Sequence, residues 1–262
     1  MINSVFFAGS ELAWLSLATA IGLAAGSFLN VVIWRLPQML LSPDTKLNLC
    51  LPGSHCPSCR HPLSWRENIP LASWLWLRGR CRHCRQAISH RYPLVELLTA
   101  LVTLWLAWRY PPGITLLALW CFSWTLIALS FIDYDHQLLP DDLTQPLLWG
   151  GLLFHLLQTP ETLAASVTGA IAGYLFFWGM YWLSRAALKR EALGFGDTKL
   201  LAALGAWGGW NALPELLLYA SVAGIAAVLL ARAVTGRIAG QPIPFGPFLA
   251  ISGWLIVVKD II

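Results

Sequence analysis

The stretch that decides the fold is LAWLSLATAIGLAAGSFLNVVIW at residues 12–34, in which no side chain is charged. A helix needs roughly 20 mostly apolar residues to cross a hydrocarbon layer about 30 Å thick, and this stretch reaches that length. It has no basic region ahead of it and no obvious small-residue cleavage site behind it, so it differs from a secretory signal. We therefore expect a retained transmembrane helix.

The rest of the chain has the same character. Of its 262 residues, 57% are hydrophobic and 11% are charged, whereas soluble domains carry about 25% charged residues. Further apolar stretches lie at residues 94–108, 114–132, 143–157, 163–183, 200–210, 213–230 and 245–258. The sequence predicts an all-α polytopic membrane protein with about eight transmembrane helices. Because the 200–210 stretch is short, six or seven spans remain open.

The positive charges orient these spans. Nine of the seventeen Lys and Arg residues lie between positions 35 and 91; the later clusters are Arg185, Lys189, Arg190 and Lys199, and then Arg232 and Arg237. Cytoplasmic loops carry an excess of such residues, so eight spans would place all three segments in the cytoplasm and both chain ends outside it. Juxtamembrane cations also meet anionic lipids. They explain the net charge of +4 without nucleic-acid binding.

Between the first two spans lies a polar segment with two cysteine pairs, Cys56-Pro-Ser-Cys59 and Cys81-Arg-His-Cys84. Each turn of this kind supplies two thiolates, and four thiolates complete a tetrahedral zinc site. A reducing cytoplasm disfavours disulfides, and a closed four-thiolate site leaves no position for a reacting water. We expect structural zinc in a small zinc-ribbon-like insertion, with three nearby histidines outside the ligand set: His55, His61 and His83.

Two acidic segments fall at predicted helix ends on the cytoplasmic side, FIDYDHQLLPDD at residues 131–142 and GFGDTK at 194–199. Ionisable groups near a membrane often mark function, although a solvated loop also explains any single one. Hydrolysis by carboxylates needs two that share a proton, one to activate water and one to protonate the carbonyl oxygen. One Asp from each segment can form that pair. Gly194 and Gly196 lack side chains, so an extended substrate can approach the second segment closely.

Taken together, these motifs resemble the type IV prepilin peptidase family, the leader peptidases and N-methyltransferases of type II secretion and type IV pilus systems. The resemblance covers nearly the whole chain. Besides the cysteine pairs and both acidic segments, it rests on GSFLNVV at 26–32, RLP at 35–37, ENIP at 67–70, RYPLVE at 91–96 and PIPFGP at 242–247.

The resemblance implies a multi-pass enzyme of the bacterial inner membrane whose active site faces the cytoplasm. It implies cleavage of the basic leader of a prepilin or pseudopilin after a glycine, followed by methylation of the new N-terminus with S-adenosylmethionine. The implied catalytic aspartates are Asp133, seven residues before Pro140, and Asp197 of the Gly-x-Gly-Asp motif. Asp135 is the rival for the first position, because Tyr134-Asp135 resembles presenilin-type relatives, but it lies two residues too close to Pro140.

Several supporting roles follow less directly. Lys199 and Glu96 are further candidates, Glu96 either for methylation or as an interfacial partner of Arg91. Asn30 is expected to contribute to methylation or to hydrogen-bond a neighbouring helix. The S-adenosylmethionine-binding residues, the oligomeric state and the identity of the cleaved prepilins are left open.

The predicted organisation has three parts: a first transmembrane helix at 1–35, a cytoplasmic zinc-binding loop domain with the four cysteines at 36–92 and a transmembrane peptidase domain at 93–262. Two rival functions make different predictions. A transporter would place its acidic residues near the bilayer middle on broken helices, whereas here they lie at one edge. A scaffold that recruits partners through the cysteine loop would leave Asp133 and Asp197 replaceable.

Overall fold

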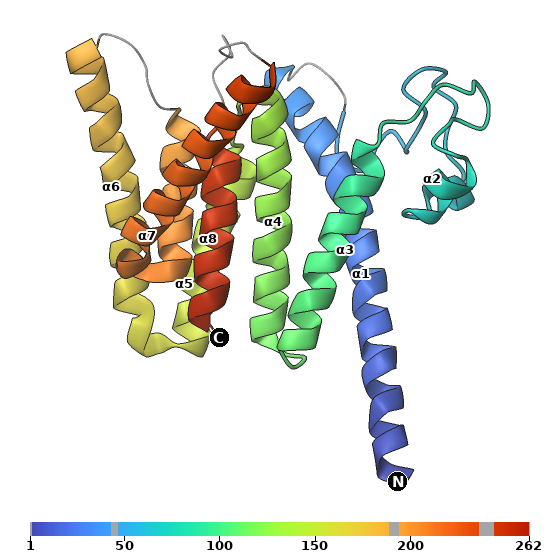
Figure 1. Ribbon diagram of the computed structural model, residues 1–262, viewed down its shortest axis with the longest axis horizontal. Helices are drawn as coiled ribbons and strands as arrows, with labels where there is room; N and C mark the ends of the chain where they lie inside the picture. The colour runs from blue at the N-terminus through green and yellow to red at the C-terminus, as the bar shows by residue number, and fades with distance from the viewer. Residues whose placement is uncertain (1, 43–46, 189–193, 236–243, 262) are drawn as a thin grey trace. The chain divides into compact units, whose positions relative to one another are not determined.

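The computed structural model describes residues 2–42, 47–188, 194–235 and 244–261, and every regular element in those ranges is helical (Figure 1). The all-helical character expected from the sequence is confirmed. The chain divides into two compact units, Met1–Trp124 and Thr125–Ile262, called unit 1 and unit 2 below. The helix α4 (Ile114–His136) runs from one unit into the other.

Unit 1 is built on α1 (Ile2–Leu41), α3 (Arg91–Arg109) and the first half of α4. The helix α1 continues past the apolar stretch that predicted it. A Cβ atom built on Gly22 would lie 2.8 Å from the Cα of Ala100, and one built on Gly26 would lie 2.7 Å from the Cα of Glu96. The backbones of α1 and α3 therefore touch directly, as small residues allow in membrane helix pairs.

The segment between α1 and α3 contains two short helices, η1 (Trp65–Asn68) and α2 (Ala72–Trp76). Buried polar side chains connect this segment and the two long helices. Asn30 donates from Nδ2 to the Tyr92 carbonyl oxygen (3.1 Å), so the expected contact with a neighbouring helix is confirmed. The Glu96 carboxylate accepts from the backbone N–H of Leu71 (2.8 Å) and from Ser27. Glu96 thus holds the start of α2 against α3.

Unit 2 contains the second half of α4 and then α5 (Asp141–Gln158), η2 (Pro160–Thr162), α6 (Leu163–Leu188), α7 (Phe195–Thr235) and α8 (Gly246–Ile261). The helix α7 consists of two arms, which correspond to the predicted apolar stretches at 200–210 and 213–230. It is kinked at Gly209, whose φ of 73° lies in the left-handed region, and the chain reverses direction there (Figure 1). At 1.5 Å per residue, the first arm is roughly 20 Å long.

Side chains from neighbouring helices satisfy backbone groups at this kink. Carbonyl groups next to a break in a helix need partners from elsewhere. The Ser166 hydroxyl donates to the Ala206 carbonyl oxygen, and His155 Nε2 lies 3.0 Å from the Trp207 carbonyl oxygen. These contacts come from α6 and α5, so the turn in α7 is held by the helices on which it packs.

Four helices in the described ranges are long and apolar enough to cross a membrane: Glu11–Leu41, Ile114–His136, Pro160–Ala186 and Phe195–Val234. The helix α8 is apolar but shorter. Of the eight expected spans, those at 94–108 and 143–157 correspond to the helices α3 and α5. Some residues used to orient the chain lie outside the described ranges: Lys46, Lys189, Arg190 and Arg237.

Candidate functional site

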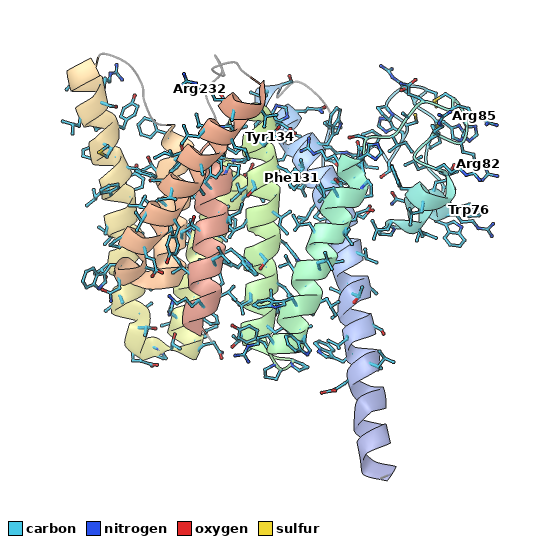
Figure 2. All side chains as sticks on the ribbon, viewed as in Figure 1. Trp76, Arg82, Arg85, Phe131, Tyr134 and Arg232 are labelled. Carbon is cyan, nitrogen blue, oxygen red and sulfur yellow. The ribbon has the colours of Figure 1, made fainter. Side chains whose placement is uncertain are left out.

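The end of α4 and the start of α7 bring two aspartates together in unit 2. Asp133 lies in the last turn of α4, and Asp197 lies in the first turn of α7. Their carboxylates are close enough for the two charges to interact. Asp133 is 5% exposed, whereas Asp135 faces solvent. Figure 2 labels Phe131 and Tyr134, which bracket Asp133 along the same helix.

A third element, the start of α8, holds the Asp133 carboxylate. The backbone N–H of Gly246 donates to Asp133 Oδ2 over 2.9 Å. The first N–H groups of a helix have no partner within the helix and favour negative charge. A Cβ atom on Gly246 would lie 2.6 Å from that oxygen, so the contact requires glycine. Sequence reasoning missed this role, and the only signal for it was the PIPFGP motif, whose Pro242 and Ile243 lie outside the described residues.

In unit 1 the four expected cysteines come together. The sulfur atoms of Cys56, Cys59, Cys81 and Cys84 all lie within 4.8 Å of one another, with 3.8 Å between Cys56 and Cys84 and 4.0 Å between Cys59 and Cys81. Tetrahedral zinc with Zn–S bonds of about 2.3 Å separates its sulfur ligands by about 3.8 Å. The cluster therefore fits a metal ion of this size and coordination.

The two cysteine pairs are held by the same local structure. In the first, the Cys56 N–H donates to the His61 carbonyl oxygen (3.0 Å) and the Arg60 N–H donates to the Cys56 carbonyl oxygen (2.9 Å). Equivalent bonds recur in the second turn around Cys81. Arg60 and Arg85 close the two turns with φ of 57° and 61°. The backbone of each turn is thus set for two sulfur ligands.

Electrostatics favours the thiolate in the first turn. The pKa of the Cys56 thiol is lowered to about 6, chiefly because the backbone N–H of Cys59 hydrogen-bonds to its sulfur. A metal binds the thiolate form of cysteine. The rings of His61 and His83 lie tilted against each other with 3.4 Å between their centroids, and the four-cysteine cluster includes neither of them.

Comparisons with known proteins cover both units. The model of the bacterial peptidase A24 N-terminal domain matches residues 20–110, and that of the type IV leader peptidase family matches residues 120–229. Proteins called prepilin leader peptidase/N-methyltransferase are similar to this chain: those of Aeromonas salmonicida strain A449, Dickeya chrysanthemi and Pseudomonas aeruginosa are 51%, 49% and 43% identical. The matches cover 93%, 95% and 95% of this chain and 91%, 94% and 92% of those proteins.

The chain belongs to the type IV leader peptidase family. The segment matched by the leader peptidase model contains both Asp133 and Asp197, whereas the N-terminal match contains the four cysteines and Glu96. No solved structure matches the chain.

The two glycines of the Gly-x-Gly-Asp motif differ in their surroundings. A Cβ atom on Gly196 would lie 2.8 Å from the Cβ of Leu139, so its missing side chain allows α7 to pack on the segment after α4. Around Gly194, the nearest atom to such a Cβ would be Asp197 Oδ2 at 3.6 Å, and the Gly194 backbone hydrogen-bonds that carboxylate. Among the described residues, a Cβ atom on Gly194 would therefore make only ordinary contacts, whereas one on Gly196 would clash with Leu139.

Lys199 forms an ion pair that connects α7 with α5. Its Nζ lies 2.5 Å and 2.7 Å from the two carboxylate oxygens of Asp141, the first residue of α5. Both side chains are partly exposed, and ion pairs of this kind contribute at most about 1 kcal/mol to stability. The pair's geometric effect is to hold the turn that carries Asp197 against the start of α5.

Proposed function

We propose that this chain is a membrane aspartic endopeptidase that removes the basic leader from type IV prepilins or type II secretion pseudopilins after a glycine. It then methylates the new N-terminal residue. The observation that carries the proposal is the pair Asp133 and Asp197, contributed by two helices to one helix-terminal site in a member of the leader peptidase family. The relatives' name, prepilin leader peptidase/N-methyltransferase, supports both activities.

In the cleavage step, Asp133 and Asp197 hold one proton between them, as two close carboxylates do. The ionised carboxylate removes a proton from water while the protonated one donates to the carbonyl oxygen of the scissile bond. The water oxygen bonds to the carbonyl carbon, the C–N bond then breaks, and the leaving amine takes up a proton. The Gly246 N–H donates to Oδ2 of Asp133 and so helps to hold this carboxylate in place.

Helical geometry supports Asp133 over Asp135. Residues two positions apart on a helix do not share a face, and only Asp133 is buried beside α8 and α7. Lys199 acts as a positioning residue through Asp141. Gly194 gives an extended substrate room beside Asp197.

The membrane arrangement we propose has eight crossings: α1, α3, α4, α5, α6, the two arms of α7, and α8. With the Lys and Arg clusters in the cytoplasm, the ends of α4, α5, α7 and α8 that carry the site lie at the cytoplasmic edge of the inner membrane. A basic leader would remain in the cytoplasm while the prepilin helix lies in the bilayer. We also propose the three-part organisation expected from the sequence, with boundaries at residues 35–36 and 92–93.

The four cysteines would hold a structural zinc ion: Cys56, Cys59, Cys81 and Cys84. The ion supplies cross-links that stabilise a segment too small to fold by apolar burial alone. Glu96 contributes by binding Leu71 at the start of α2. S-adenosylmethionine would supply the methyl group.

The test is cleavage of a synthetic prepilin by purified full-length protein carrying Asp133→Asn, Asp197→Asn or Asp135→Asn. We expect the first two to lose at least a hundredfold in kcat, in line with the loss of a general acid or base, and Asp135→Asn to remain near wild type. Methylation of an already cleaved pilin serves as the folding control. Full cleavage by Asp197→Asn would reject the peptidase site, and loss at Asp135 but not at Asp133 would move the first carboxylate.

A further inference from the structure

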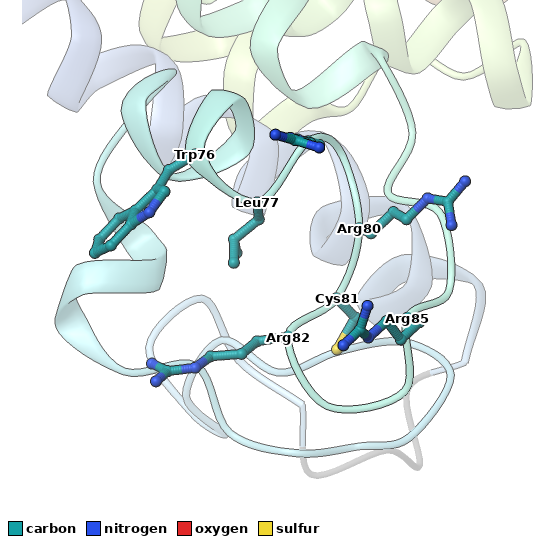
Figure 3. A pocket seen from close by; sticks show the side chains of 7 residues that line it. Trp76, Leu77, Arg80, Cys81, Arg82 and Arg85 are labelled. Atoms are coloured by element: carbon teal, nitrogen blue, oxygen red, sulfur yellow. The ribbon is translucent and has the colours of Figure 1, made fainter.

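The cysteine-bearing segment of unit 1 contains a basic hollow of about 610 Å³ (Figure 3). Its lining is four arginines, two apolar side chains and one cysteine of the four-cysteine cluster: Arg78, Arg80, Arg82, Arg85, Trp76, Leu77 and Cys81. Figure 3 shows Trp76 and Leu77 on one side of the hollow and Arg80 and Arg85 on the other. The site therefore presents positive charge opposite an apolar surface.

Two fixed structures hold these residues. The helix α2 ends at Trp76, and the chain then turns through Arg78 and Gly79 with φ of 52° and 67°. The Gly79 N–H donates to the Trp74 carbonyl oxygen over 2.9 Å, and a Cβ atom on Gly79 would lie 2.8 Å from the Trp74 ring. The second cysteine turn follows at once and positions Arg82 and Arg85. Local hydrogen bonds therefore set the backbone at Arg78, Arg80 and Arg85.

The charge around the hollow is unbalanced. Residues 47–90 contain six arginines and one carboxylate, Glu67. Glu67 accepts hydrogen bonds from the N–H and hydroxyl of Ser64 (2.9 Å and 2.6 Å), and the charge of Arg82 acts on it. A zinc ion held by four thiolates would add a net charge of −2, which still leaves positive charge in excess. The hollow thus suits an anion.

The segment that carries the hollow is attached to the start of α3. The Leu71–Glu96 hydrogen bond and the contact between the rings of Trp74 and His90 (5.1 Å) hold α2 near the start of α3. Leu94 and Leu98 are exposed in that part of α3. On α2, the side chain of Trp76 is 77% exposed, and Figure 2 shows Trp76, Arg82 and Arg85 on the side away from α1 and α3. Tryptophan in such a position is typical of the headgroup level of a membrane.

We propose that this hollow binds the phosphate of an anionic phospholipid headgroup, with Trp76 and Leu77 contacting the lipid below it. Arginine forks bind phosphate through paired hydrogen bonds, and anionic lipids attract basic residues next to membrane spans. S-adenosylmethionine suits the hollow less well, because its sulfonium cation would meet four guanidinium groups. The proposal is independent of the peptidase assignment.

The test uses the full-length protein in detergent, mixed with equal amounts of phosphatidylglycerol and phosphatidylcholine. Native mass spectrometry then counts the lipids that stay bound. We expect the wild-type protein to prefer phosphatidylglycerol and the double variant Arg82→Gln/Arg85→Gln to lose roughly tenfold or more of that preference. The double variant Arg78→Gln/Arg80→Gln should show the same loss. Both of these arginines lie outside the cysteine turns.

The matched control is Arg60→Gln/Arg66→Gln, which removes the same charge from the same segment. Arg60 occupies in the first cysteine turn the place that Arg85 has in the second, but neither control residue lines the hollow. This control should keep the wild-type preference, and bound zinc should be equal in all proteins. Three outcomes would each overturn the proposal. The control and test variants could lose the preference equally, or the wild-type protein could show no preference for phosphatidylglycerol. Inorganic phosphate could also displace the bound lipid as effectively as phosphatidylglycerol does.

Discussion

At the scale of single residues, the position of Asp133 depends on the backbone N–H of a glycine, Gly246. Burying a carboxylate is costly unless donors replace its water, and the Gly246 N–H at the start of α8 is such a donor. Asp135, two positions further along α4, faces solvent. Asp133 therefore accepts a hydrogen bond from a second helix, α8, whereas Asp135 is exposed.

We expect Gly246→Ala to reduce prepilin cleavage by roughly a hundredfold, because a misplacement of about 1 Å in a catalytic group can have that effect. The added Cβ would lie 2.6 Å from Asp133 Oδ2, so the carboxylate must move. Gly179→Ala is the control, since a Cβ there would meet no atom within 4 Å. Cleavage by Gly246→Ala at the wild-type rate would show that Asp133 does not need this contact.

At the scale of elements, the cysteine turns predict one bound metal ion per chain. We expect Cys56→Ser and Cys81→Ser to lose bound zinc, measured by elemental analysis of the purified protein, because each removes one of four ligands. Limited proteolysis within residues 47–90 should become faster in the same variants. Cys50→Ser is the control, because Cys50 is an exposed cysteine of the same segment outside the cluster. Unchanged zinc in the first two variants would reject the four-thiolate site.

The kink in α7 gives a second prediction at this scale. A residue with a side chain costs about 1–3 kcal/mol at backbone angles that are essentially restricted to glycine, as those of Gly209 are, so Gly209→Ala should lower the thermal stability of the purified protein. Gly224→Ala in the second arm should be neutral or stabilising, because its Cβ would make only ordinary contact with Phe248 at 3.7 Å and alanine is the better helix former. A stabilising effect at both positions would contradict the backbone angle at Gly209.

At the scale of the whole molecule, the eight-crossing arrangement predicts which loops face the cytoplasm. An alkaline phosphatase domain, which is active only outside the cytoplasm, should be active when inserted after Gly113 and inactive when inserted after Gln137. These positions flank α4, so they must lie on opposite sides if α4 crosses the membrane. Activity at the second site and not at the first would reverse the orientation and place Asp133 at the outer edge.

Much of this arrangement was accessible from the sequence because it depends on local patterns. The length of an apolar run predicts a membrane helix without reference to other residues, and two cysteines in one turn supply two metal ligands wherever the turn is placed. The two stretches predicted at 200–210 and 213–230 correspond to the two arms of α7, but the sharp turn between them could not be predicted from a local pattern. It depends on the backbone angle of Gly209 and on the partners that α5 and α6 provide for the kink.

The sequence by itself determined the helical membrane character, the four-cysteine cluster and the two acidic segments, because run length, ligand spacing and charge are properties of neighbouring residues. Only the tertiary structure decided that Asp133 is the buried acidic residue of its segment and that Gly246, 113 residues away, holds it. It also decided that Gly196 makes room for Leu139. The physical reason is that burial and hydrogen-bond partners arise from contacts between distant segments, and one chain's local pattern does not encode those contacts.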